Sequence, residues 1–270
     1  MESFEDKVAL ISGGSRGVGF ALARRLTRAG ARVVITARGK ERLEKSAEIL
    51  RKEGAEVETV AGDIGDLNAA EKMVSAAIEH YERLDLLVNN AGVSMRGDFS
   101  DLSAEVCSRV IATNLVGSVN LSRIALKHII QARGQIVFVS SIAGLFGLPG
   151  ASVYCATKKA LTGLCESLRL ELLPKGVNVG VVYLGFTEHD PEKRILAANG
   201  ELVLPDRPAH HTQDQAAARI MKMLAGREKQ LIMTPIGNLG WLAYRLSPGL
   251  VEKVVLWAKA TRFSLFRKFS

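Results

Sequence analysis

The sequence predicts an α/β fold, in which a doubly wound sheet of seven parallel strands carries helices on both faces. Three observations lead to this prediction. Short runs rich in Val, Ile and Leu alternate along the chain with longer amphipathic stretches. The runs are apolar throughout, as in strands that are buried on both sides. Parallel strands need crossover connections, and right-handed crossovers through helices build a doubly wound sheet.

Seven apolar runs are the candidate strands, and amphipathic stretches between them are the candidate helices. We expect strands at 7–12, 32–37, 55–64, 84–90, 134–141, 176–184 and 230–235. We expect helices at 17–29, 40–53, 68–82, 103–132 and 152–173. There is no linker and no internal repeat, so we expect one domain. Residues 1–236 would form its main body, and residues 237–270 a basic helical tail of the same domain.

The composition is ordinary for a globular protein, with 47% hydrophobic and 24% charged residues. The first residues, MESFEDK, have neither the basic start nor the apolar stretch of a signal peptide. Cys107, Cys155 and Cys165 show neither metal-ligand spacing nor an even-numbered disulfide framework. The sequence therefore predicts reduced thiols, no metal site and a cytoplasmic protein. The uncharged run 134–157 contains four glycines and a proline, which favours a buried strand and a loop over a membrane span.

The segment from about 185 to 212 departs from the regular pattern. It is polar, it is interrupted by prolines, and it is too long for an ordinary connection. Loops of this length are usually functional lids or disordered segments, so we expect a substrate loop here. His210 and His211, near its end, are more typical of a surface loop than of a substrate contact.

A glycine-rich turn, SGGSRGVG, follows the first predicted strand. Glycines at 13, 17 and 19 permit a tight turn and the close approach of a pyrophosphate to a helix N-terminus. A glycine-rich turn without a ligand is the alternative. The position of this turn, between the first strand and the first helix of an α/β sheet, favours nucleotide binding.

Tyr154 and Lys158 are one helical turn apart in an otherwise uncharged stretch. A free tyrosine titrates near pH ~10, but an adjacent ammonium favours the phenolate and lowers that pKa. The N-terminus of the predicted helix acts in the same direction. In an arbitrary sequence such a pair is more often a packed aromatic and a solvated charge. With a serine pair upstream and the glycine turn in place, acid–base chemistry is the favoured interpretation.

Together these motifs resemble the short-chain dehydrogenase/reductase family over roughly residues 5–235. The matching features are Gly13-x-x-x-Gly17-x-Gly19, Asp63-Ile64, the NNAG of Asn89–Gly92, Asn114, Ser141 and Tyr154-x-x-x-Lys158. The resemblance implies a Rossmann-type fold, a bound nicotinamide dinucleotide, and the interconversion of a ketone and a secondary alcohol. It also implies a homodimer or homotetramer that associates through the helices at 103–132 and 152–173.

The resemblance also assigns roles to individual residues. The catalytic set would be Asn114, Ser141, Tyr154 and Lys158. Tyr154 would protonate the carbonyl oxygen, Ser141 would hold that oxygen, and Asn114 would anchor a water that leads protons to Lys158. The family's spacing to the tyrosine selects Ser141 over Ser140. The cofactor would be held by Gly13, Ser15, Arg16, Gly17, Val18, Gly19, Arg38, Asp63, Ile64, Asn90, Gly92, Tyr154, Lys158 and Thr187.

One stretch departs from the family pattern. The family usually has Pro-Gly after the sixth strand, and a threonine a few residues later that contacts the nicotinamide amide. This chain has Leu184-Gly185-Phe186-Thr187, so the proline is replaced and the threonine comes early. Thr187 remains a candidate contact, and the sequence does not predict the conformation of the backbone at the floor of the substrate pocket.

The end of the second predicted strand indicates which cofactor binds. An acidic residue there would bond the 2′-hydroxyl of NAD and repel a 2′-phosphate. This chain has Ala37 followed by Arg38, and Arg16 lies in the glycine turn. Guanidinium–phosphate contacts are charge-assisted, so the pair of arginines predicts NADP(H).

The C-terminal region indicates an apolar partner. Between Gly237 and Ser270 there are six Lys or Arg and one acid. From Pro248 onward, apolar residues recur at helical spacing. Such a helix can lie on a membrane, cover a lipophilic pocket, or pack on its own domain or a second subunit. With the apolar LFGLPG loop after Ser141, it predicts a hydrophobic, lipid-like substrate and peripheral membrane contact.

Two other function classes remain open. A 3-ketoacyl thioester reductase could dock an acidic carrier protein on the basic surface. A non-catalytic NADP-binding sensor would keep the cleft without the chemistry, although such a protein has no need for an activated phenol. Nucleic-acid binding is not expected, because no recognition module accompanies the basic tail.

Overall fold

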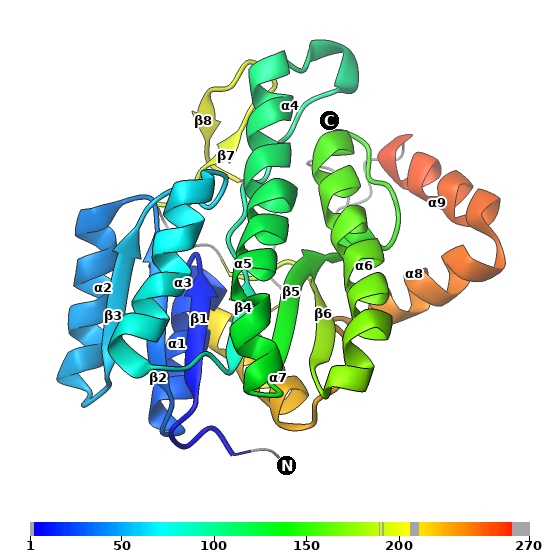
Figure 1. The fold of residues 1–270 in the computed structure, drawn as a ribbon. Helices are drawn as coiled ribbons and strands as arrows, with labels where there is room; N and C mark the ends of the chain where they lie inside the picture. Colours follow the sequence, from blue (N-terminus) through cyan, green and yellow to red (C-terminus); the bar gives the residue numbers. More distant parts are fainter. Residues whose placement is uncertain (1–2, 189, 191, 206–210, 261–270) are drawn as a thin grey trace.

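The computed structural model describes residues 3–188, 190, 192–205 and 211–260, and it has the predicted α/β fold (Figure 1). Seven parallel strands form one sheet in the order β3-β2-β1-β4-β5-β6-β9. They are β1 (Val8–Ser12), β2 (Arg32–Ala37), β3 (Val57–Ala61), β4 (Leu86–Asn89), β5 (Gln135–Ser141), β6 (Asn178–Leu184) and β9 (Gln230–Ile232). Each predicted strand is confirmed. The strand order reverses between β1 and β4, where sheets of this kind bind their ligands.

Helices cover both faces of the sheet. One layer contains α1 (Gly17–Arg28), α2 (Lys40–Lys52) and α7 (Gln213–Ala225). The other contains α3 (Leu67–Tyr81), α5 (Gly117–Gln131) and α6 (Ser152–Leu172), which lie in front of the sheet in Figure 1. Short 3₁₀ turns occupy Phe99–Asp101, Ile142–Gly144 and Leu173–Lys175.

The first strand shows why the strands are apolar throughout. Val8 and Leu10 pack into the core beneath α3, α5 and α6. Ala9 and Ile11 point the other way, into the core beneath α1, α2 and α7. Successive side chains of a strand face opposite sides, and here both sides are covered, so every position is buried.

The predicted long helix at 103–132 contains an irregular turn. It begins as α4 (Ala104–Ile111), widens into one π-helical turn (Ala112–Val116), and continues as α5. Asn114 lies in this turn, and Ser118 Oγ donates to the Asn114 carbonyl oxygen at 3.1 Å. Single π turns inside α-helices are frequent at functional sites.

The loop after β6 is less irregular than predicted. It contains a small antiparallel hairpin of β7 (Ile195–Leu196) and β8 (Leu202–Val203). The backbone of Leu196 bonds to that of Ser94 and Arg96, at 2.9 and 2.8 Å, and Ser103 N donates to the Ala198 carbonyl oxygen at 3.0 Å, which fixes the hairpin beside the start of α4. Strands of two residues are too short to produce an alternating pattern, which explains why the sequence did not indicate them.

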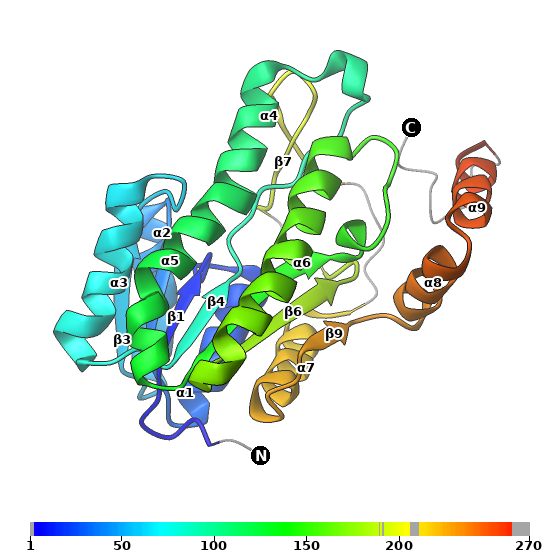
Figure 2. The same cartoon turned by 45° about the vertical axis from the view of Figure 1, so that its right-hand side comes forward.

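The C-terminal region forms α8 (Pro235–Leu246) and α9 (Pro248–Ala260), at the right-hand edge of the molecule in Figure 2. The Thr234 hydroxyl caps α8 by accepting a hydrogen bond from Gly237 N at 2.9 Å. The helical start predicted at Pro248 is confirmed. The basic residues Arg262, Arg267 and Lys268 lie outside the described residues, as does His210. None of the helices in the described part of the chain has the length and apolar character needed to span a bilayer.

The helix α7 was not among the predicted elements. Its start carries a capping box, in which Thr212 accepts a hydrogen bond from Gln215 N and the Gln215 side chain accepts one from Thr212 N. This Thr-x-x-Gln pattern was the available sequence signal.

Candidate functional site

The glycine turn between β1 and α1 forms a backbone cradle at the carboxyl edge of the sheet. A Cβ added at Gly19 would lie 2.3 Å from the Gly13 carbonyl oxygen, so no side chain fits there. Gly17 has a φ of +62°, and the space in front of its Cα holds no described atom within 4 Å. No side chain caps α1 at Arg16. These features fit a pyrophosphate bound to the free N–H groups at the start of α1.

Asn90 and Ser12 hold the cradle in shape. The Asn90 amide nitrogen donates to the carbonyl oxygens of Ser12 and Gly13, at 2.9 and 3.1 Å. Ser12 Oγ accepts hydrogen bonds from the backbone N–H groups of Asn90 and Ala91, both at 3.0 Å. The resemblance pointed to Asn90, but Ser12 was missed. The available sequence signal was a serine at the last position of an apolar strand, and in the structure this serine is fully buried.

The residues expected around the adenosine lie at the ends of β2 and β3. Arg38 Nη1 is 3.9 Å from Asp63 Oδ2, and both side chains are about half exposed. Asp63 Oδ1 accepts a hydrogen bond from Gly65 N at 2.9 Å, which shapes the turn into α3. Ile64 is buried, against Gly117 at the start of α5. The side chain of Ile64 therefore packs inward, and its role in holding the adenine stays a prediction.

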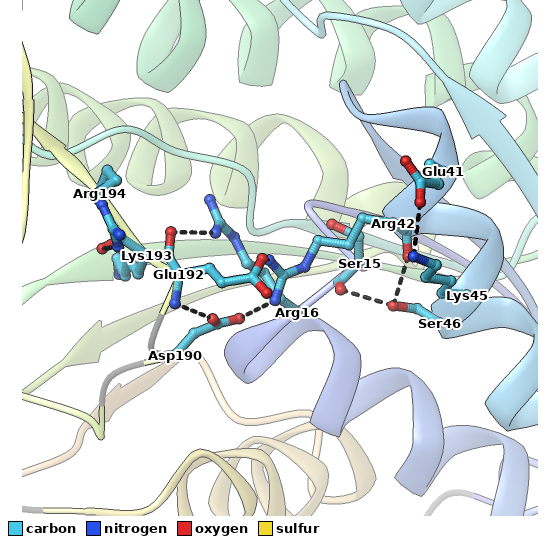
Figure 3. Close-up of polar contacts among 10 residues, drawn as sticks. All are labelled: Ser15, Arg16, Glu41, Arg42, Lys45, Ser46, Asp190, Glu192, Lys193 and Arg194. Carbon is cyan, nitrogen blue, oxygen red and sulfur yellow. Dashed lines mark hydrogen bonds and ion pairs between the residues drawn. The ribbon is translucent and has the colours of Figure 1, made fainter.

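Other predicted cofactor contacts serve the turn itself. The carbonyl oxygen of Ser15 accepts a hydrogen bond from Ser46 Oγ at 2.8 Å, which ties α2 to the cradle. Val18 is buried in the core below α1. Arg16 Nη1 donates to the carbonyl oxygen of Glu192, at 3.3 Å, in the loop after β6 (Figure 3).

The two serines at the end of β5 have different environments. Ser140 is 2% exposed, and its hydroxyl donates to the Lys158 carbonyl oxygen at 2.9 Å beneath α6. Ser141 is half-buried at the strand end, where its Oγ accepts a hydrogen bond from Ala143 N at 3.2 Å. The Ser140 hydroxyl thus holds α6 against the sheet, and Ser141 is the more exposed of the two serines.

Tyr154 and Lys158 lie on one face of α6, as their spacing predicts. Lys158 Nζ is 5.8 Å from the centre of the Tyr154 ring. The ammonium donates to the Val139 carbonyl oxygen at 2.9 Å and is almost completely buried. Burial, and secondarily the positive charge of Lys193, lower the pKa of Lys158 to about 8. A lysine tuned in this way can exchange a proton near neutral pH.

Asn114 and Lys158 come together in front of Gly92. The Asn114 amide bonds both backbone groups of Val93, accepting from its N–H at 2.8 Å and donating to its carbonyl at 2.9 Å. It also donates to Thr157 Oγ1 at 3.2 Å. A Cβ added at Gly92 would lie 3.2 Å from Asn114 Oδ1 and 3.5 Å from Lys158 Nζ. The glycine therefore keeps open a polar space that both groups border.

Thr187 lies directly after β6 and is 8% exposed. It pairs through the backbone with His211, and Glu188 N donates to the His211 carbonyl oxygen at 2.7 Å. This pairing closes the base of the loop after β6. The contact between Thr187 and a nicotinamide amide stays a prediction.

Several residues of the cleft had no motif in the sequence. In addition to Ser12, these residues are Arg42, Thr157, Asp190, Glu192 and Lys193. Arg42 resembles any charged residue of a surface helix, and the acids lie in a polar loop whose path the sequence did not indicate. Their positions depend on how the loop after β6 folds back on α2.

The comparisons with known proteins agree with the family and the fold that the sequence predicts. The family model for short chain dehydrogenases matches residues 7–199. A dehydrogenase/reductase SDR family protein 7-like from Anopheles gambiae is 32% identical over 95% of this chain and 83% of its own length. An 11-beta-hydroxysteroid dehydrogenase-like 4A from Arabidopsis thaliana is 37% identical over 70% of this chain and 63% of its own length.

A short-chain dehydrogenase/reductase from Burkholderia phymatum, solved in complex with NAD, has the same fold. The TM-score is 0.83, with 22% identity over 93% of this chain and 96% of the other. The resemblance seen in the sequence is confirmed by the matched family model and by these relatives: the chain belongs to the short-chain dehydrogenase/reductase family of oxidoreductases.

Proposed function

We propose that this protein is an NADP(H)-dependent oxidoreductase that interconverts a ketone and a secondary alcohol on a hydrophobic, lipid-like substrate. One observation supports it most: the buried Lys158 ammonium lies beside the Tyr154 ring and borders the same space as Asn114, at the end of the sheet that carries the glycine cradle. A protein that only binds nucleotide has no need for a phenol beside this ammonium.

The residues of the site have complementary roles in this reaction. The bound nicotinamide supplies or accepts the hydride at the substrate carbon. In reduction, the Tyr154 hydroxyl gives its proton to the carbonyl oxygen, while the Ser141 hydroxyl donates a hydrogen bond that holds this oxygen in place. Lys158 then returns a proton to the phenolate, and the space bordered by Asn114 is the proposed route by which Lys158 regains it. Oxidation reverses each transfer.

The preference for the phosphorylated cofactor rests on charge at the end of β2. Ala37 offers no carboxylate to a ribose 2′-hydroxyl, and Arg38 follows it at the edge of the cleft. Arg16 lies in the glycine turn, where its Nη1 donates to the Glu192 carbonyl oxygen. Two guanidinium groups favour a 2′-phosphate over a hydroxyl.

An apolar wall beside Ser141 supports the hydrophobic substrate. Leu145 and Leu148 are nearly buried, and Phe146 packs against Tyr244 of α8 with their ring centres 6.3 Å apart. α8 therefore covers the loop that follows the catalytic serine. The steroid-dehydrogenase-like name of one relative is consistent with a substrate of this class.

A screen of ketones and alcohols tests this function. Turnover is followed at the nicotinamide absorbance, with NADPH, NADH and their oxidised forms, and the substrates include free and carrier-bound 3-ketoacyl thioesters. We expect NADPH-dependent reduction of long-chain or polycyclic ketones. Salt-sensitive preference for the carrier-bound thioester would support the alternative reductase class. Cofactor binding without turnover of any substrate would support the sensor.

We also propose that α8 and α9 bind an anionic lipid surface. Seven large apolar side chains along these helices are between 50% and 78% exposed: Leu239, Leu242, Leu246, Leu250, Val254, Leu256 and Trp257. Arg245 and Lys253 lie among them, which gives the face the charge that complements anionic headgroups. Such a face would bring the apolar wall of the site close to a membrane-dissolved substrate.

Vesicle flotation tests the lipid contact. We expect the protein to float with vesicles that contain anionic lipid, and Leu246→Glu with Trp257→Glu to abolish this. Leu67→Glu, on the exposed start of α3, is the matched control. Equal flotation of all variants would contradict the proposal. A change of mass in sedimentation for the paired variant alone would identify α8 and α9 as a subunit interface instead.

Association into a homodimer or homotetramer is supported by a second apolar surface. Its exposed side chains on and beside α4, α5 and α6 are Ile111, Val116, Val119, Leu170 and Leu173. Sedimentation of the wild type and of Leu170→Glu tests this assignment, and an unchanged mass would contradict it.

A further inference from the structure

Two acids of the loop after β6 bind an arginine of α2 (Figure 3). Arg42 Nη2 lies 2.6 Å from Asp190 Oδ2, and Arg42 Nη1 contacts Glu192 Oε2. Asp190 Oδ1 also accepts a hydrogen bond from Glu192 N at 2.9 Å, so the two acids form one unit. The Asp190 side chain is only 11% exposed. This pair is therefore less screened by water than an ordinary surface ion pair.

The acid unit lies beside the glycine cradle. The carbonyl oxygen of Glu192 accepts a hydrogen bond from Arg16, which precedes α1. One turn beyond Arg42 on α2, Ser46 donates to the Ser15 carbonyl oxygen in the cradle. Arg16, Arg42 and the Ser15 backbone thus form one corner beside the glycine cradle, where Glu192 contacts Arg16 through its carbonyl oxygen and Arg42 through its carboxylate (Figure 3).

This corner is where the proposed function puts the 2′-phosphate, because the glycine turn and the end of β2 meet there. Without a ligand, the Arg38 guanidinium lies near the Asp63 carboxylate, and Arg42 is paired with the carboxylates of Asp190 and Glu192. Arg16 donates to the backbone carbonyl oxygen of Glu192. A phosphate monoester brings close to two further negative charges at neutral pH. It would repel the acids of the loop and compete with them for the same guanidinium donors.

We propose that Asp190 and Glu192 are specificity determinants: they are internal anions that compete with the cofactor's 2′-phosphate for the arginines of this corner. The inference rests on the proposed use of NADP(H). The acids lower the affinity for a 2′-phosphorylated nucleotide and leave the affinity for an unphosphorylated one nearly unchanged. Because binding couplings are reciprocal, the phosphate also weakens the hold of Arg42 on the loop.

The loop connects this corner to the reacting groups. Beyond the acid unit, Lys193 lies close enough to Lys158 for its charge to act on it. The backbone of Leu196 is then fixed to Ser94 and Arg96. The stretch between the acids and this anchor crosses from the adenosine end of the cleft to the catalytic end. Release of the acids would therefore loosen the segment next to the substrate.

Nucleotide fragments test the competition without any turnover. The full chain is titrated calorimetrically with 2′,5′-ADP and with 5′-AMP, as wild type, Glu192→Gln and Asp190→Asn. Both substitutions remove a charge and keep the side-chain size. We expect each to tighten 2′,5′-ADP binding by roughly three- to tenfold, and to change 5′-AMP binding by less than twofold. The gain should shrink at high salt.

Glu201→Gln is the matched control, because it removes the same charge from the same loop at the exposed position next to β8. It should change neither affinity. Limited trypsin digestion gives a second measurement: 2′,5′-ADP, but not 5′-AMP, should speed cleavage of the wild type after Lys193 or Arg194. Thermal melts verify that every variant is folded.

The outcomes separate this inference from the proposed cofactor. If the wild type prefers 2′,5′-ADP but Glu192→Gln and Asp190→Asn leave that preference unchanged or weaken it, the competition is refuted and NADP(H) use stands. If the wild type, Glu192→Gln and Asp190→Asn all bind the two fragments equally, the 2′-phosphate is not a ligand, and both proposals fail together.

Discussion

A buried charge has opposite effects on stability at the two edges of the central sheet, the amino and the carboxyl ends of its strands. At the amino edge, the Asp85 carboxylate accepts hydrogen bonds from Val8 N at 3.0 Å and from the Arg83 guanidinium at 2.7 and 2.8 Å. Lys7 Nζ lies 3.4 Å away. At the carboxyl edge, Lys158 is as deeply buried, but within the described residues no ion pair joins it to a carboxylate.

The pKa values reflect this difference. Burial by itself would raise the pKa of Asp85, but the hydrogen bonds from Arg83 and Val8 and the nearby positive charges outweigh it, so that pKa is lowered. For Lys158, burial disfavours the charged form and lowers the pKa to about 8. The amino edge thus stabilises its charge and the fold with it. At the carboxyl edge the buried Lys158 charge destabilises the fold. Charges of this kind are typical of functional sites.

The largest effect is expected from Tyr154→Phe, which removes the proposed proton donor at the carboxyl edge. The turnover number should fall by roughly 10²- to 10⁴-fold, the range for loss of a general acid. The dissociation constant for the nicotinamide cofactor should stay within about twofold. Tyr81→Phe, at the end of α3, is the control and should keep full activity. Wild-type turnover by Tyr154→Phe would refute the proposed mechanism.

Lys158→Met sharpens the comparison in stability. The lowered pKa corresponds to a free-energy penalty on the order of 3 kcal/mol for keeping the Lys158 ammonium charged in the folded protein. The substitution removes this penalty, but it also removes the hydrogen bond to Val139, which costs about 1 kcal/mol. The cofactor-free variant should therefore be more stable by about 2 kcal/mol at pH 7, although it is inactive.

The pH dependence has a definite sign. Below about pH 8 both the folded and unfolded wild type hold the proton, so the penalty is complete. Between about 8 and the model-compound value of 10.5 the unfolded chain binds more protons, so wild-type stability rises with pH and the advantage of the variant disappears. Denaturation at pH 7, 9 and 10.5 measures this. Lys159→Met, exposed on the same helix, should show no such trend.

Asp85→Asn should have the opposite effect at the amino edge. It leaves Arg83 and Val8 with weaker partners, so we expect a loss of about 1–3 kcal/mol at pH 7. Because the folded pKa of Asp85 is lowered, the difference should persist above about pH 4 and fade as the pH drops further. Activity per folded molecule should be unchanged. The exposed Glu79→Gln on α3 is the control, and an equal loss there would contradict a specific role for Asp85.

The smallest expected effects on stability come from two glycine substitutions that add the same methyl group at different places. Gly163, within α6, has open space around its Cα, so Gly163→Ala should stabilise by roughly 0.5–1 kcal/mol and leave activity intact. Gly92→Ala would place a methyl group between Asn114 and Lys158. We expect that variant to fold but to lose turnover, with near-normal cofactor affinity. Equal activity of the two variants would exclude a proton path through this space.

The sequence predicted the sheet and most helices because each depends on local chemistry. Buried strands are apolar at every position, and the glycine turn needs glycine whatever surrounds it. Tyr154 and Lys158 could be paired because four residues make one helical turn. The choice of Ser141 over Ser140 depended on the family resemblance, and the structure supplies the physical reason: the Ser140 hydroxyl is bound to α6.

The remaining features depend on long-range folding. Arg42 meets Asp190 across almost 150 residues of sequence, through a loop whose path has no periodic signal. The π turn at Asn114 has a similar origin, since its widened backbone is stabilised by Val93 and Thr157 from other segments. No local sequence pattern predicts the contact of Arg42 with Asp190 or the contacts of Asn114 with Val93 and Thr157.

That widened turn has a consequence for how this protein can change over evolution. One π turn amounts to a single residue inserted into an α-helix, and each residue of a helix turns its successors by about 100°. Deleting one codon between Ala112 and Val116 would leave a regular helix, yet it would rotate Asn114 away from Val93 or misalign all of α5 against the sheet. Substitutions are tolerated far more easily along this helix than any change in its length.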